Sequence, residues 1–205
     1  MKQVVLVGDS IRLGYEPFVK AALQDVAEVW GPEQNCGHSL DCLKLAHLWC
    51  DHRQPDLIHF NCGLHDIRTR FYGEPAGRTL VPLDHYRAHL FALVEAMRTR
   101  TRAQLIWAST TPVIDEVAHR DHARWRDFDR HHADVLRYNE AAREVMISSG
   151  VEINDLHAAV MARDPATLQN GDGVHYTAEG SLHLASLVAR AIVTRLHPPV
   201  QALAG

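Results

Sequence analysis

Three residues in distant parts of the chain have side chains that together could hydrolyse an ester. Ser10 follows an apolar run that ends in Gly8-Asp9, and Asp172 and His175 lie three positions apart in a glycine-containing segment near the C-terminus. A carboxylate that binds Nδ1–H of a histidine fixes the imidazole tautomer and leaves Nε2 to take a proton from a serine hydroxyl. Nucleophilic catalysis by a serine is therefore the chemistry to test against the rest of the sequence.

Neither feature is specific by itself. Asp and Ser are common in ordinary turns and helix caps, and a chain with 15 histidines is expected to contain an Asp-x-x-His by chance. A nucleotide-binding loop is excluded, because the segment 7–14 matches neither GxGxxG nor GxxxxGK[ST]. The case for catalysis therefore depends on where the fold places these residues.

Short apolar runs alternate with longer segments of helical periodicity, which predicts an α/β protein with helices on both faces of a parallel sheet. The expected strands are 3–7, 27–30, 57–60, 104–108 and 151–153. The expected helices are 17–25, 40–50, 84–100, 131–149 and 177–196, with Gly150 ending one and Thr177 capping another. The polar stretches 67–82 and 110–130 are expected to be loops that cover or shape a site, or solvated surface excursions.

In such a sheet, the loops that follow the strands meet at the carboxyl edge, where ligands of open α/β folds bind. Ser10 follows the first expected strand, Gly37 the second and the segment 61–66 the third, and Asp172 and His175 precede the last helix. A glycine backbone N–H and a side-chain N–H in these loops could both donate to an oxyanion. The alternative for each glycine is a turn that requires it.

Four short segments, taken in order, resemble the sequence blocks of the SGNH (GDSL-like) hydrolases and span residues 8 to 175. They are Gly8-Asp9-Ser10, Gly37, Gly63-Leu64-His65-Asp66 and Asp172-Gly173-Val174-His175. The resemblance implies a flavodoxin-like three-layer α/β/α sandwich with a five-stranded parallel sheet, and it implies no cofactor and no metal.

The resemblance also assigns roles to residues. It implies that Ser10 is the nucleophile, His175 the base and Asp172 the group that orients the base, and that backbone N–H groups of Ser10 and Gly37 form an oxyanion hole with a side chain of the third block. That side chain is His65 here, where the family has asparagine, so an imidazole N–H would replace an amide and could make activity pH-dependent. Asn61 is a substitute donor if the loop bends. Asp9 and Asp66 are expected first to hold their loops through backbone N–H bonds.

Composition limits the partners of the protein. A chain of 205 residues suits one domain, with 197–205 as a flexible tail, and 46% hydrophobic and 22% charged residues are ordinary for a globular protein. The net charge of −4 gives no reason to expect nucleic acid or an anionic membrane. No apolar run approaches the ~18 residues of a membrane helix. The N-terminus resembles no signal peptide, so we expect a cytoplasmic protein with four free thiols.

The expected substrate is a small ester with a short acyl group, acetyl above all, on a polar alcohol such as a carbohydrate. Arg68, Arg70, Tyr72 and Arg78 in one expected loop and Trp125 in the other favour this, and Asp9, Arg68 and Trp125 are candidate substrate contacts. The alternatives are a lysophospholipase or thioesterase of the same family, and a non-catalytic binding module on the same fold. A metal site is a further alternative, formed by His119, Asp121, His122, His131 and His132.

Overall fold

Five parallel strands form the central sheet of the computed structural model, which describes residues 1–51, 53–71 and 78–197. The strands are β1 (Lys2–Val7), β2 (Ala27–Trp30), β3 (Leu57–Phe60), β5 (Gln104–Ala108) and β7 (Glu152–Asn154). Their order is β2-β1-β3-β5-β7, and every neighbouring pair is parallel. With the strands numbered inside the sheet this is the flavodoxin-like order. The predicted five-stranded parallel sheet is confirmed.

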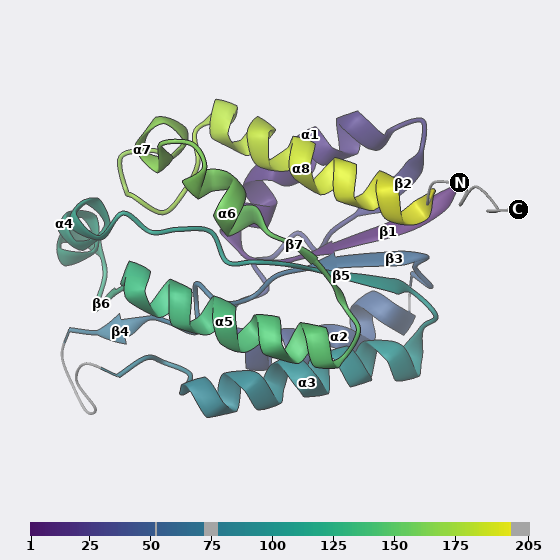
Figure 1. Cartoon of the computed structure of the whole chain (residues 1–205), viewed down its shortest axis with the longest axis horizontal. Helices are drawn as coiled ribbons and strands as arrows, with labels where there is room; N and C mark the ends of the chain where they lie inside the picture. Colours follow the sequence, from purple (N-terminus) through teal and green to yellow (C-terminus); the bar gives the residue numbers. More distant parts are fainter. Residues whose placement is uncertain (52, 72–77, 198–205) are drawn as a thin grey trace, which may run out of the picture.

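Helices cover both faces of the sheet (Figure 1). One face carries α1 (Ser10–Leu23) and α8 (Ala178–Leu196), which contact each other. The other carries α2 (Ser39–Asp51), α3 (Leu83–Arg100) and α5 (His132–Ser148), packed side by side. The three-layer α/β/α sandwich is therefore confirmed, and so is the cap at Thr177, whose side chain accepts a hydrogen bond from Gly180 N–H.

The strands are buried according to their place in the sheet. All four residues of β3 are buried, as are Val4 to Val7 of β1, while the edge strand β7 is half-buried along its length. A strand covered by helices on both faces must present apolar side chains on both, so it reads as a continuous apolar run. This is why β1, β3 and β5 are recognisable in the sequence.

The first helix begins seven residues before its expected start. It runs from Ser10 rather than from position 17, with Pro17 inside it. Gly14 and Pro17 weaken the local helix signal, but Ile11, Tyr15, Val19 and Leu23 form a buried stripe at four-residue spacing. Tertiary burial of that stripe outweighs the propensity of two residues, and it places Ser10 at the N-terminus of a helix.

The two expected loops contain structure of their own. α4 (Asp115–Trp125) lies in the second, and β4 (Thr69–Arg70) pairs antiparallel with β6 (Phe128–Asp129), joining the two stretches. Only Ala118 and His122 of α4 are buried, so no apolar periodicity marked it. The short helices α6 (Leu156–Met161) and α7 (Pro165–Leu168) were also missed. Positions 72–77 of the first stretch, including Tyr72, and 198–205 of the expected tail lie outside the described residues.

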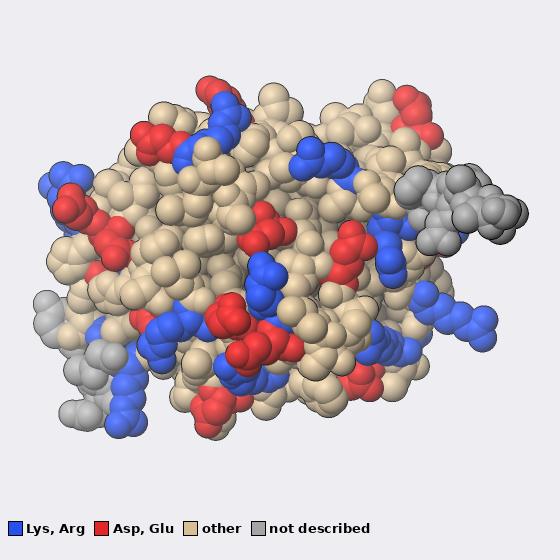
Figure 2. Space-filling view, viewed as in Figure 1, with Lys and Arg blue, Asp and Glu red and all other residues tan. Residues whose placement is uncertain are grey.

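The surface carries both signs of charge. Figure 2 shows acidic and basic side chains intermixed on one face, without a broad region of a single sign. Within the described ranges, no helix is both long enough and apolar enough to cross a membrane. The four cysteine side chains are buried and free.

Candidate active site

The structure brings Ser10, His175 and Asp172 into one hydrogen-bonded chain. Ser10 Oγ lies 2.8 Å from His175 Nε2, and His175 Nδ1 lies 2.6 Å from Asp172 Oδ2. With Nδ1–H donated to the carboxylate, Nε2 is the free base that faces the serine hydroxyl. This is the arrangement in which an imidazole can take the proton of an attacking serine.

Hydrogen bonds to Asp172 and close packing against α4 hold the loop that carries Asp172. Asp172 Oδ1 accepts hydrogen bonds from Val174 N–H and His175 N–H, each 2.9 Å long. Burial alone would raise the pKa of Asp172, but the hydrogen bonds from His175 and Val174 outweigh it and hold the pKa below its ordinary value. Gly173, at φ +70°, lets α4 approach closely, because a Cβ there would lie 2.9 Å from Ala118 N. Asp172 is therefore a fixed, ionised partner of His175.

Ser10 is the first residue of α1, and Asp9 caps that helix. Asp9 Oδ1 accepts the Ile11 N–H at 2.9 Å, and the Asp9 side chain is buried. Burial raises the pKa of Asp9, and the backbone bond from Ile11 opposes this. The predicted structural role of Asp9 is confirmed. Ser10 thus lies where the unsatisfied N–H groups and dipole of a helix N-terminus favour negative charge.

A buried ion pair that sequence reasoning missed ties this turn to the loop after β2. Arg12 pairs with Glu16, one helical turn further on, and its Nη2 donates to Gln34 O at 2.8 Å. Cys36 N–H donates to Gly8 O at 3.1 Å in the same region. A charged pair at four-residue spacing normally indicates a solvated helix face, so no local pattern indicates that this pair is internal.

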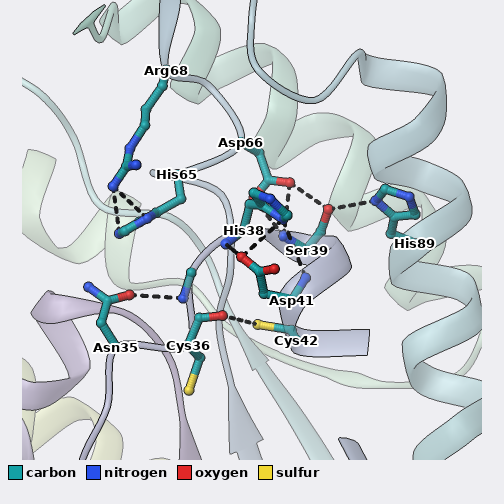
Figure 3. Close-up of polar contacts among 11 residues, drawn as sticks. Asn35, Cys36, His38, Ser39, Asp41, Cys42, His65, Asp66, Arg68 and His89 are labelled. Atoms are coloured by element: carbon teal, nitrogen blue, oxygen red, sulfur yellow. Dashed lines mark hydrogen bonds and ion pairs between the residues drawn. The ribbon is translucent and has the colours of Figure 1, made fainter. Parts of the chain in front are cut away.

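Asp66 links the loop after β3 to the start of α2. Its carboxylate accepts Ser39 N–H at 3.0 Å and Ser39 Oγ–H at 2.5 Å, and Ser39 Oγ also lies 2.9 Å from His89 Nδ1 (Figure 3). Burial raises the pKa of Asp66 to about 7, against the hydrogen bonds from Ser39. The predicted role of Asp66 as a loop anchor is confirmed.

His65 points away from Asp66 and toward Arg68 (Figure 3). Arg68 Nη2 lies 2.6 Å from His65 Nδ1 and 3.4 Å from Nε2. A guanidinium only donates, so the closer ring nitrogen, Nδ1, must accept, and the ring proton is assigned to Nε2. Burial, followed by the charge of Arg68, lowers the pKa of His65 to about 3. His65 is therefore neutral across the physiological range, which removes the reason to expect pH-dependent donation.

The other candidate donors are placed differently. Gly37 is in the left-handed region at φ +70°, and its N–H donates to Asn35 Oδ1 at 2.9 Å. Asn61 Nδ2 donates to Ala108 O at 2.6 Å, which directs that amide to the neighbouring strand. Of the side-chain donors considered, His65 is the one that lies with Ser10 on a common cavity.

That cavity has a volume of about 310 Å³. Its lining includes Ser10, His175, Asp172, His65 and Arg68, together with Asn35, Asp121, His122, Arg126, Phe128, Arg130 and Val174. Trp125 is 74% exposed at the end of α4, and Trp125, Asp9 and Gly37 are not among the lining residues. Arg126, Phe128 and Arg130 are contributions that the sequence did not single out, although they lie in a stretch marked as a site loop.

A second cavity, of about 410 Å³, adjoins the first at Asn35, which lines both. Its walls are mostly apolar and come from the end of β2, from the loop between β2 and α2, from α2 and from the segment after it: Trp30, Pro32, Cys36, Leu45, Leu48 and Trp49, with Glu33, Gln34 and Arg53. Neither Ser10 nor His175 lines it.

Two of the four histidines considered as metal ligands, His119 and His122, contact a carboxylate instead. His119 Nδ1 lies 2.5 Å and His122 Nδ1 2.9 Å from the two oxygens of Asp129. Among the described residues, no three His, Cys, Asp or Glu side chains are grouped so that they could hold a metal ion.

Solved structures of GDSL-like lipases and acylhydrolases share this fold. A lipase/acylhydrolase from Enterococcus faecalis superimposes with a TM-score of 0.77 at 20% identity, covering 98% of this chain and 100% of that one. A GDSL-like lipase from Bacteroides thetaiotaomicron gives 0.73 at 16% identity, covering 95% and 89%. Axe2, an acetylxylan esterase from Geobacillus stearothermophilus, gives 0.70 at 21% identity, covering 93% and 94%. No family model and no curated protein sequence matches the chain. The implied SGNH hydrolase fold is confirmed.

Proposed function

We propose that the protein is a serine esterase that hydrolyses a carboxylic ester through an acyl-enzyme on Ser10. The observation that carries the proposal is the continuous chain from Ser10 Oγ to His175 Nε2 at 2.8 Å and from His175 Nδ1 to Asp172 at 2.6 Å, opening onto a cavity. These distances support the roles proposed here, with Ser10 as nucleophile, His175 as its base and Asp172 as the group that orients the base. Structures of the same fold include proteins named as acylhydrolases and acetylxylan esterases.

The residues divide the reaction into two similar steps. Ser10 Oγ attacks the ester carbonyl carbon while His175 Nε2 takes its proton, and the carbonyl oxygen becomes an oxyanion. Collapse of this tetrahedral intermediate breaks the bond to the alcohol, which leaves with the proton from His175. Water then attacks the acyl-Ser10 ester with His175 again as base, and the acid is released. Asp172 stabilises the imidazolium that forms in each step.

Two donors are placed to stabilise the oxyanion in this proposal. One is Ser10 N–H at the start of α1, where the helix end favours negative charge. The other is His65 Nε2–H, which the contact from Arg68 to Nδ1 leaves free to donate. Gly37 N–H is a third donor in the family pattern. To bind the oxyanion here, it would have to donate to the oxyanion and to Asn35 Oδ1 together, or break its hydrogen bond to Asn35.

The substrate proposed for this site is an ester of a short acyl group, acetyl in the first place, on a polar alcohol, with a carbohydrate as a candidate. Most of the residues around Ser10 are polar or charged, and guanidinium groups disfavour alkyl chains because their hydration would be lost. A short acyl group displaces little of this water.

A longer acyl chain, as in a lysophospholipase or thioesterase, is the second candidate. The apolar cavity of about 410 Å³ supports it, because a chain held on Ser10 could pass Asn35 and bury its tail against Leu45, Leu48 and Trp49. This candidate needs the two cavities to act together, whereas the first needs only the cavity that Ser10 lines.

The proposal is tested by hydrolysis of 4-nitrophenyl acetate by the wild-type chain and by Ser10→Ala, with circular dichroism as a control for folding. The wild type is expected to release nitrophenol and acetate, and Ser10→Ala is expected to retain only background hydrolysis with an unchanged spectrum. Full activity in folded Ser10→Ala would refute the assignment of the nucleophile. An inactive wild type against a panel of esters would favour the binding-module alternative.

A further inference from the structure

Three arginine side chains line the same cavity as Ser10 and His175. Arg68 follows β3, and Arg126 and Arg130 flank β6. Within the part of the chain that the structure describes, none of the three forms an ion pair with a carboxylate, whereas Arg12, Arg87, Arg100, Arg137 and Arg143 do. Unpaired guanidinium groups in a concave site are free to bind an anion.

Arg130 is buried and is held in place by hydrogen bonds. It is only 7% exposed, and its Nε donates to Leu64 O at 2.6 Å while Nη1 lies 3.2 Å from His122 Nε2. His122 is fixed in turn by Asp129, 2.9 Å from its Nδ1. These contacts use two of the three guanidinium nitrogens. Among the described residues, no acceptor binds Nη2 of Arg130, although Arg130 lines the cavity.

Phe128 holds two of the arginines close to each other. The Arg68 guanidinium carbon lies 4.6 Å and that of Arg130 4.8 Å from the centroid of the Phe128 ring. Stacking on an aromatic ring orients a guanidinium without neutralising it. Both cations therefore face the cavity in fixed positions.

Burial and repulsion between these cations lower the pKa of Arg130 and of Arg68. Burial, then the charge of Arg68, lowers the pKa of Arg130 to about 10, and burial followed by the charge of Arg126 lowers the pKa of Arg68. With a pKa of about 10, Arg130 remains cationic at neutral pH. Two carboxylates also line the cavity, of which Asp172 is bound to His175 and Asp121 is left. Of the carboxylates that line the cavity, Asp121 alone is left to balance three guanidinium groups. Asp9, Asp41 and Asp127 also act on Arg68 electrostatically, and Asp9 acts on Arg130, but none of these three carboxylates lines the cavity.

We propose that the natural ester substrate carries an anionic group, a carboxylate or a phosphate, which Arg126 and Arg130 bind beside the ester attacked by Ser10. The inference rests on the proposed esterase function and specifies its substrate class. A planar or tetrahedral oxyanion group suits the paired N–H donors of guanidinium. Binding it would also relieve the repulsion among the three cations.

The test compares substrates that differ only in charge. The wild type is given 4-acetoxybenzoate and its neutral analogue 4-acetoxybenzamide, which place a charge on the alcohol side of an acetyl ester. A second pair, mono(4-nitrophenyl) succinate and 4-nitrophenyl butyrate, places the charge on the acyl side. One of the two anionic esters is expected to exceed its neutral partner in kcat/KM by about tenfold or more, as for a charge-assisted hydrogen bond. The pair that shows the preference identifies the side of the ester that carries the anion.

Arg126→Gln is the informative variant, because Arg126 is exposed and its loss should not disturb folding. It is expected to reduce the preference for the anionic ester by about tenfold. Arg124→Gln is the matched control, since Arg124 lies on the same segment, is exposed and does not line the cavity. It should keep the preference. Equal kcat/KM for both members of both pairs, or an equal loss in the two variants, would overturn the inference.

Binding without turnover separates this inference from the proposed function. Calorimetric titration of Ser10→Ala should show tighter binding of the preferred anionic ester than of its neutral partner, and Arg126→Gln in the same background should remove the difference. If the wild type hydrolyses none of the esters but Ser10→Ala still discriminates by charge, the anion site stands and the esterase proposal fails. If Ser10→Ala binds the charged and neutral esters equally, the anion site fails whatever the wild type hydrolyses.

Discussion

The two cavities that share Asn35 differ in what they can do. The smaller one, about 310 Å³, contains Ser10, His175 and three arginines, and the larger one, about 410 Å³, is walled mainly by Trp30, Leu45, Leu48 and Trp49. Burying apolar surface away from water lowers the free energy of the system, whereas removing water from charged groups raises it. The more apolar cavity is therefore the better general binding surface, but its one thiol, Cys36, is not activated, because burial raises the pKa of Cys36 to about 11. Reactive groups rather than volume identify the site.

The charged cavity also makes a structural demand that the apolar cavity does not make, because its charged side chains need hydrogen-bond partners. Asp172, Arg68 and Arg130 line this cavity, and each has a hydrogen bond to backbone or to histidine, because a buried charge without partners destabilises the fold. The apolar cavity needs only side-chain packing. Substitutions in the first should act on turnover, and substitutions in the second should act on little beyond local packing.

The largest effect is expected from Asp172→Asn. The amide oxygen would keep the bonds from Val174 N–H and His175 N–H, so the NH2 group would face His175 Nδ1. A donor at that position forces the ring proton onto Nε2, which is the wrong tautomer for a base. We expect kcat on 4-nitrophenyl acetate to fall about 10⁴-fold with KM little changed. Steady-state kinetics measure the fall. A loss below about tenfold in a folded variant would mean that Asp172 does not act through His175.

The next largest effect is expected at His65. If Nε2–H donates to the oxyanion, His65→Ala should lower kcat by about 10²–10³-fold with KM little changed, because the donor acts on charge that develops only in the transition state. His65→Asn should restore much of the loss, since an amide N–H can take the place of the imidazole. The measurements are kcat, KM and melting temperature for both variants.

A structural role for His65 would give a different pattern. Its removal would then lower the melting temperature, and asparagine would restore activity only together with stability. The pH profile adds a further check. Because the pKa of His65 is about 3, its protonation should cause no loss of activity between pH 5 and 8, and the loss would come only as the pH falls toward 3. Unchanged turnover in His65→Ala would show that other groups form the oxyanion hole.

A smaller effect is expected when the acyl chain of the substrate is lengthened, and it shows which of the two cavities binds the acyl group. 4-Nitrophenyl acetate should be turned over at least about tenfold faster than the octanoate, because a long chain would have to displace water from the arginines. Leu48→Gln places a polar group in the apolar cavity and should change both rates less than about twofold if only the charged cavity binds substrate. A rate that rises with chain length and falls in Leu48→Gln for the octanoate alone would favour the longer-chain candidate.

Much of this fold could be predicted from the sequence, and the exceptions share one cause. β1, β3 and β5 are buried on both faces and are recognisable as apolar runs, and α3 and α8 carry clear periodicity. α4 buries only Ala118 and His122, so its position depends on contacts such as Ile114 N–H to Gly173 O, 2.9 Å, that no local pattern records. Elements that depend on long-range contacts rather than on their own apolar face are not visible in one sequence.

The same limit applies to the candidate site. Ser10, Asp172 and His175 could be proposed because each occupies a recognisable motif. Arg130 and Phe128 carry no motif, and their places in the cavity depend on the β4–β6 pairing and on a hydrogen bond to Leu64 O across 66 positions of sequence. The partner of His65 was likewise not predictable, since Arg68 at three positions further on was assigned to substrate rather than to the imidazole.

Covalent labelling tests most directly whether Ser10 is an activated nucleophile. A fluorophosphonate reacts with a serine only when a base activates its hydroxyl, so incubation with the wild type followed by peptide mass spectrometry reports which serine is activated. We expect one adduct, on Ser10, formed rapidly in the wild type and lost in His175→Ala, with the folded state checked by circular dichroism. An adduct on another serine, or no adduct on Ser10 in the folded wild type, would contradict it.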